Sequence, residues 1–103
     1  MSKEEQTKSG DIYEELFARR KRRQEELKEA IENANEMAML VDGHDDALAG
    51  YDTQGRAIYF VDAIIGTLMQ RDGMTQDEAT EFFDFNIAGA YVGEYTPIYM
   101  YEE

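Results

Sequence analysis

Apolar residues in the first forty positions recur at the three- and four-residue steps of an amphipathic helix. They form two patches, one at Tyr13, Leu16 and Phe17 and the other at Leu27, Ile31, Ala34 and Ala38. No Gly or Pro interrupts residues 11–40, and strong helix formers dominate them. The pattern predicts a disordered polar lead over residues 1–10 and then a helix over 11–40, which Asp11 caps and whose core-facing part is about 27–40.

This predicted helix is longer than the rest of the chain can cover. At 1.5 Å per residue, some 28 helical residues span about 40 Å, whereas a domain of this size has a radius of gyration of about 13 Å. The amino-terminal half is expected to project or to pair with a second copy. Residues expected to mediate oligomerisation are Tyr13, Leu16, Phe17 and Arg20.

A β-hairpin is predicted over residues 47–60. Two apolar segments, 47–51 and 56–60, flank the sequence Asp-Thr-Gln-Gly. Asp52 at the start of such a turn and Gly55 at its end suit a type I turn closed by a left-handed glycine.

Two short helices and a third strand are predicted to follow. Asp62 can cap the first helix, which ends near Gly73, and Thr75 with Glu78 forms a capping box for the second. Residues 96–101 alternate in the manner of a strand.

Together these elements predict an α+β fold. A long amino-terminal helix precedes an acidic body, residues 41–103, in which the hairpin and the last strand form a small antiparallel sheet with two short helices packed on it. The predicted core residues are Leu27, Ile31, Leu48, Ile58, Phe60, Ile64, Ile65, Leu68, Phe82, Phe83 and Ile98.

Charge is distributed unevenly along the 103 residues, whose net charge is −13. Residues 1–28 hold eight basic and seven acidic side chains, whereas residues 29–103 hold two basic and sixteen acidic ones, a net −14. Such a body repels nucleic acid and anionic membranes and attracts basic protein surfaces. The alternative is that the acids serve only solubility.

Candidate catalytic chemistry is sparse. The chain has no cysteine, which excludes disulfides and thiolate chemistry. His44 lies among Asp42, Asp45 and Asp46, but this spacing matches no defined metal-binding loop. We therefore predict no enzymatic activity, no cofactor and no metal. No apolar run approaches the ~20 residues of a membrane span, and the polar amino terminus is unlike a secretory signal, so a cytoplasmic location is expected.

The one basic run is Arg19–Arg23. It could contact nucleic acid or the acidic body of a second copy. It also fits a solvated helix face, because Glu15 precedes Arg19 by four residues, the spacing of a helical ion pair.

Tyrosines and acids gather toward the carboxyl terminus. Exposed tyrosines beside carboxylates are typical of protein-binding surfaces, although core packing of some rings is the alternative. The predicted partner-binding residues are Tyr95, Tyr99, Tyr101, Glu94, Asp84, Glu81 and Asp77.

Residues 45–98 resemble a group of small acidic proteins encoded by tailed phages and prophages. The similarity rests on three segments: Asp45-Asp46-Ala47-Leu48-x-Gly50-Tyr51-Asp52-x-x-Gly55-Arg56-Ala57-x-Tyr59, then Leu68-Met69 with Gly73-Met74-Thr75, and Glu81-Phe82-Phe83-Asp84-Phe85-Asn86-Ile87-x-Gly89-Ala90-Tyr91-x-Gly93-Glu94-x-Thr96-Pro97-Ile98. Residues 1–40 lie outside it. The resemblance implies a phage accessory protein in a bacterial cytoplasm and transfers no catalytic residue.

Three functions are compatible with these features. The leading hypothesis is a non-enzymatic protein that binds and inhibits a host nucleic-acid-handling or defence protein through its acidic surface, in the manner of a DNA mimic or anti-CRISPR protein. The second is a self-assembling structural or scaffold component of a phage. The third is a small metal-dependent enzyme centred on His44.

Overall fold

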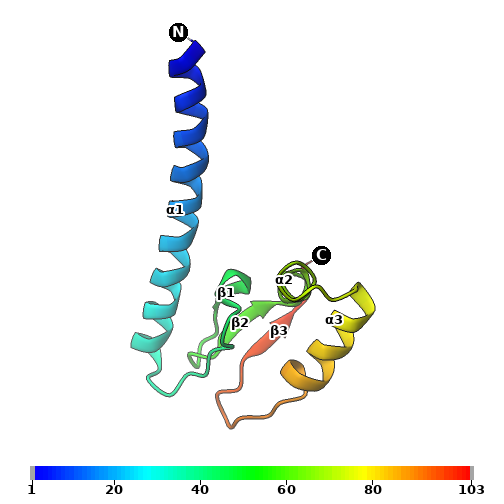
Figure 1. The fold of residues 1–103 in the computed structure, drawn as a ribbon. Helices are drawn as coiled ribbons and strands as arrows, with labels where there is room; N and C mark the ends of the chain where they lie inside the picture. The colour runs from blue at the N-terminus through cyan, green and yellow to red at the C-terminus, as the bar shows by residue number, and fades with distance from the viewer. Residues whose placement is uncertain (1, 103) are drawn as a thin grey trace.

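The computed structural model describes the backbone of residues 2–102 and the side chains of residues 12–102. Helices and a three-stranded mixed sheet confirm the α+β class (Figure 1). In chain order the elements are α1 (Ser2–Ala34), the 3₁₀ turn η1 (Asp45–Ala47), β1 (Leu48–Tyr51), β2 (Ala57–Phe60), α2 (Val61–Asp72), α3 (Gln76–Phe82), the π-helical segment η2 (Phe83–Ala88) and β3 (Ile98–Met100).

The predicted hairpin is confirmed. β1 and β2 pair antiparallel, and Gly55 has a φ of 79°. One Asp52 carboxylate oxygen accepts the backbone N–H groups of Gln54 and Arg56 at 2.9 and 2.8 Å, and the other accepts the Arg56 Nε–H at 2.6 Å. The turn is therefore fixed by its own short-range chemistry.

The third strand exists, but its predicted direction is wrong. β3 pairs with β2 parallel, with Tyr59 opposite Tyr99, so the sheet is mixed and not antiparallel. Residues 61–97 lie between the two strands and carry α2, α3 and η2. This connection is long enough to return the chain to the starting end of the sheet, as parallel pairing requires.

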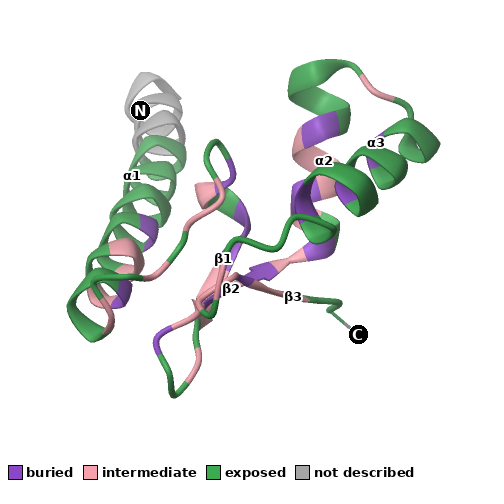
Figure 2. Cartoon of the chain, turned by 90° about the horizontal axis from the view of Figure 1, so that it is seen from below, coloured by how far each residue is buried: buried purple, intermediate pink, exposed green. Residues whose placement is uncertain are grey.

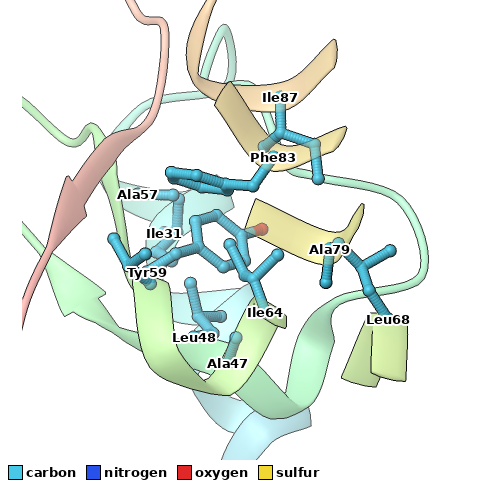
Figure 3. Close-up of a cluster of buried hydrophobic side chains, with 11 residues drawn as sticks. Ile31, Ala47, Leu48, Ala57, Tyr59, Ile64, Leu68, Ala79, Phe83 and Ile87 are labelled. Atoms are coloured by element: carbon cyan, nitrogen blue, oxygen red, sulfur yellow. The ribbon is translucent and has the colours of Figure 1, made fainter. Parts of the chain in front are cut away.

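The core uses the opposite side of β2 from the predicted one. Ala57 and Tyr59 are buried, whereas Ile58 and Phe60 are only half-buried. A tyrosine is tolerated there because its hydroxyl accepts the Val41 N–H at 2.9 Å. Predicted core residues Leu27, Ile65 and Ile98 are also half-buried, and Phe82 is exposed. The buried apolar residues are Ile31, Ala47, Leu48, Ala57, Tyr59, Val61, Ile64, Leu68, Ala79, Phe83 and Ile87 (Figure 3).

The first two helices do not begin at their predicted caps, and α1 does not extend to residue 40. α1 begins at Ser2 and ends at Ala34, so residues 2–10 are helical and Asp11 is inside the helix. Asp62 does not cap α2; it lies in the first turn, and Phe60 precedes the helix without a side-chain cap. The Thr75–Glu78 capping box is confirmed by hydrogen bonds of 3.2 and 2.9 Å.

α1 rises from one end of the sheet as an isolated rod, while α2 and α3 group at the other end (Figure 1). α1 contacts β1 and η1, and its buried residues among the described side chains, Gln24 and Ile31, lie in its carboxyl-terminal half. The molecule measures 57 × 36 × 24 Å. No helix within the described residues is long and apolar enough to cross a membrane.

Candidate protein-binding interface

α3 and η2 form one continuous helical segment with a buried side and an exposed side. Ala79, Phe83 and Ile87 recur at steps of four and are buried. The Phe83 ring meets the Tyr99 ring edge-on, with centroids 5.4 Å apart. In Figure 3 the Phe83 ring lies next to the Tyr59 ring, and Ile87 lies beyond Phe83 in the same cluster. This packing turns the remaining side chains of the segment toward solvent.

Two phenylalanines lie on the exposed side. Phe85 is 75% exposed and Phe82 is 38% exposed. They line one shallow depression together with two carboxylates and an amide. We call this surface the α3 face; its residues are Glu78, Glu81, Phe82, Phe85 and Asn86.

Local geometry fixes how the α3 face is presented. The capping box starts α3 at Gln76, and the π-helical segment follows without a break. Gly89 ends the segment in close contact with its backbone: a Cβ at this position would lie 2.8 Å from the Asp84 carbonyl oxygen and 3.2 Å from that of Phe85. Only glycine fits this approach. π-helical turns occur often at functional sites.

The carboxyl-terminal segment that carries the α3 face is acidic. Residues 72–103 contain eight Asp or Glu and no Lys, Arg or His. Hydrogen bonding from the Thr75 backbone N–H lowers the pKa of the Glu78 carboxyl, which favours its ionised form. Asp77 and Asp84 are exposed beside the face, and among the described side chains neither Glu81 nor Asp84 forms an ion pair.

An apolar cavity of about 140 Å³ adjoins the α3 face, since Asn86 lines both. Its walls include Met39, Val92 and Pro97. The loop beside it is ordered by Thr96, whose hydroxyl accepts the Val92 N–H at 3.0 Å and donates to the Gly93 carbonyl at 2.6 Å. Exposed apolar surface therefore continues from the helix onto this loop.

The structure groups some of the predicted partner-binding residues and not others. Asp77, Glu81 and Asp84 are exposed along α3 and η2, and Glu94 is exposed on the loop before β3. Tyr101 is exposed just after β3, and Tyr95 is half-buried.

The prediction that Tyr99 is an exposed anchor is wrong. Its ring stacks on Tyr59 with centroids 6.2 Å apart and meets Phe83 edge-on, and burial raises the pKa of its hydroxyl. The register of β2 and β3 explains this position, because Tyr99 lies opposite Tyr59 and shares its side of the sheet.

Sequence reasoning assigned Phe82 to the core and did not include Phe85 among the partner-binding residues. One signal was available in the sequence. Ala79, Phe83 and Ile87 define one helical stripe at steps of four, and neither Phe82 nor Phe85 falls on that stripe.

The residues predicted to mediate oligomerisation lie on the free half of α1. Tyr13, Leu16 and Phe17 are exposed large apolar side chains. Arg20 and Phe17 line a groove of about 520 Å³ between α1 and α2. These residues share one region of the surface, separate from the α3 face (Figure 1).

His44 is only 4% exposed. Burial, followed by the nearby Arg71 guanidinium, lowers the pKa of its imidazole. Its Nδ1 atom has no hydrogen-bond partner among the described residues. Within the same part of the chain, no three His, Asp or Glu side chains gather as a metal site would require.

Comparison with known protein families, with curated proteins and with solved structures finds no match to this chain.

Proposed function

We propose that this protein is a non-enzymatic binding module whose α3 face attaches to a basic surface of a host protein. The observation that carries the proposal is the exposure of Phe85, at 75%, beside Phe82 in a depression edged by Glu78 and Glu81. Adjoining apolar surface of this kind, rimmed by charge, is typical of protein-binding sites.

The carboxylates and the aromatic rings of this surface have separate roles in binding. Carboxylates on a segment without a single basic residue speed the encounter with a positively charged partner, and salt screens that effect. Phe82 and Phe85 supply the apolar anchors that slow dissociation once they are buried. A partner with basic side chains around an apolar pocket therefore fits best.

DNA mimicry in the strict sense needs a long row of carboxylates. On α3 and η2 the exposed row consists of Asp77, Glu81 and Asp84, with axial rises of about 6 and 4.5 Å between them at 1.5 Å per residue. So short a row, with aromatic rings beside it, favours a partner recognised by charge and apolar contact together.

The resemblance of residues 45–98 to small acidic phage proteins supports a partner in a bacterial cytoplasm. Host proteins that handle nucleic acids, including defence nucleases, carry the basic grooves that an acidic protein can occupy. We propose that occupancy of such a groove inhibits the host protein. No step of this mechanism requires turnover, a metal or a cofactor.

The proposal is tested by capture from lysate of a bacterial host with variants of the immobilised protein. The partner must be lost with Glu81→Lys/Asp84→Lys and with Phe85→Ser, and retained with Glu29→Lys/Glu36→Lys, whose exposed acids lie away from the α3 face. Glu78 is left unchanged because it belongs to the capping box. Capture that survives both α3-face variants would refute the proposal.

Two further outcomes separate this proposal from its competitors. The isolated protein should not bind duplex DNA at physiological salt, and His44→Ala should still bind the captured partner provided that it folds. A folded His44→Ala variant without activity would favour a metal-dependent enzyme.

A structural role in a phage particle is the second candidate. It is favoured by the exposed apolar residues of α1, which lie apart from the α3 face.

A further inference from the structure

α1 leaves the body of the protein at Gln24. This buried side chain donates from Nε2 to the backbone carbonyls of Asp45, at 2.6 Å, and Leu48, at 3.2 Å. Lys28 adds an ion pair of 3.0 Å to the Asp45 carboxylate. Every residue from 12 to 23 is exposed (Figure 2), so about 18 Å of helix stands clear at 1.5 Å per residue.

The face that packs at the base of α1 continues uncovered along this free part. Ile31 and Gln24 are buried on it, and steps of three and four lead from Gln24 through Arg20 to Phe17 and Tyr13. Phe17 is 72% exposed, and Ile12 and Leu16 are exposed beside it. Helices gain most of their stability from packing such a face.

The groove between α1 and α2 lies beside this exposed part of α1. Phe17, Arg20 and Gln24 line its α1 side, while Ala63 and Gly66 line its α2 side. Small side chains on the α2 side leave space for another helix to approach closely. A Cβ built on Gly66 would meet no atom within 4 Å.

The charges that flank Phe17 identify the occupant of this space. Glu14 and Glu15 precede Phe17, and Arg19 and Arg20 follow it, so acids and bases are placed symmetrically about one residue. In an antiparallel pair of α1 helices with Phe17 at the centre, Glu14 lies level with Arg20 of the second copy, and each is three positions from Phe17, near the same face. Glu15 and Arg19 are already joined within one helix by an ion pair of 2.6 Å, so Glu14 and Arg20 carry the charge complementarity. A parallel pair would instead place like charges side by side.

We infer that α1 pairs antiparallel with α1 of a second copy, centred on Phe17, and that residues 12–17 of each helix enter the groove of the other copy. The interface is then isologous, the commonest arrangement of homodimers. This inference is independent of the partner proposed for the α3 face, which lies elsewhere on the molecule.

Mass in solution gives the first test. Light scattering over a concentration series should show a dimer, and Phe17→Asp should raise its dissociation constant at least about tenfold. Phe17 is exposed in the single chain, so this variant should keep the wild-type thermal midpoint at low concentration. Met37→Asp, at a residue that is 68% exposed outside α1, is the matched control and should leave the mass unchanged.

Cysteine cross-linking tests the orientation, because the chain contains no cysteine of its own. Phe17→Cys should form an intermolecular disulfide under mild oxidation. Tyr13→Cys should not, since two such residues are separated by about 12 Å along the axis and a disulfide needs Cα atoms within about 7 Å. Mixing Tyr13→Cys with Lys21→Cys should restore the cross-link.

Charge exchange provides an independent test of the same orientation. Glu14→Lys should weaken the dimer, and adding Arg20→Glu to the same chain should restore it; Glu15 and Arg19 are left unchanged because they form an ion pair within one helix. A monomer at every concentration, a Phe17→Asp dimer as tight as the wild type, self-linking of Tyr13→Cys as fast as that of Phe17→Cys, or no restoration by charge exchange would each overturn the inference.

Discussion

Gly89→Ala is expected to destabilise the protein, although alanine can adopt the backbone conformation of this residue. The φ of −77° and ψ of −9° are ordinary for any L residue. Its added Cβ, however, would lie 2.8 Å from the Asp84 carbonyl oxygen, about 0.6 Å inside the 3.4 Å of ordinary contact. Backbone atoms of η2 must move to relieve this overlap, because no flexible side chain is involved.

The magnitude follows from two opposing effects. Overpacking a tight site costs about 1–3 kcal/mol, and the reduced entropy of the unfolded alanine chain offsets about 0.4–1 kcal/mol of it. We expect a net loss of about 0.5–2 kcal/mol, which lowers the midpoint of thermal unfolding by several degrees, since about 1 kcal/mol shifts it by some 4–8 °C in a domain of 60–100 residues.

Gly66→Ala is the matched control, and we expect it to raise the free energy of unfolding. Gly66 lies inside α2, where an added Cβ meets nothing, so alanine should stabilise the helix by about 0.5–1 kcal/mol. Both variants are unfolded at the same low protein concentration, because association adds to apparent stability. If Gly89→Ala were as stable as Gly66→Ala, the tight η2 backbone that presents Phe85 would be refuted.

Three further predictions concern the scaffold. Gly55→Ala should cost more than about 1–2 kcal/mol in urea unfolding, because its φ is 79° and the new Cβ would collide with Asn35; an unchanged midpoint would contradict the turn. Because burial lowers the pKa of His44, the unfolded chain takes up its proton first, so stability should be full above about pH 6.5 and fall as pH drops below it; His44→Asn, the variant without an imidazole, should lose that dependence. Tyr59→Phe should cost about 1–2 kcal/mol of unfolding free energy, because it removes the acceptor of the Val41 N–H; an unchanged unfolding free energy would show that this hydrogen bond contributes nothing. Burial raises the pKa of the Tyr59 hydroxyl to about 12, so phenolate absorbance should show it ionising near that pH in the wild-type protein.

The elements that sequence predicted well depend on chemistry within a few residues. The turn at Asp52–Gly55 and the Thr75–Glu78 capping box are closed by side-chain and backbone groups three or four positions apart. Such interactions are favourable whatever surrounds them, and so the residues alone identify them.

Features that sequence did not predict depend on where distant segments meet. The direction of β3 depends on the end of the sheet to which residues 61–97 return the chain, and alternation along a strand carries no information about direction. In β2, residues on both sides are apolar, so the choice of Tyr59 over Phe60 for the core was decided by the Val41 N–H and by Tyr99. The exposure of Phe85 likewise depends on Phe83 packing against Tyr99.

The binding rates of the captured host partner test the role of the α3 face most directly. Wild-type and variant proteins are compared by real-time binding at low and high salt. We predict that Glu81→Lys/Asp84→Lys slows association and removes most of its salt dependence, that Phe85→Ser speeds dissociation, and that Glu29→Lys/Glu36→Lys changes neither rate by more than about twofold. Equal rates for wild type and both α3-face variants would contradict the account.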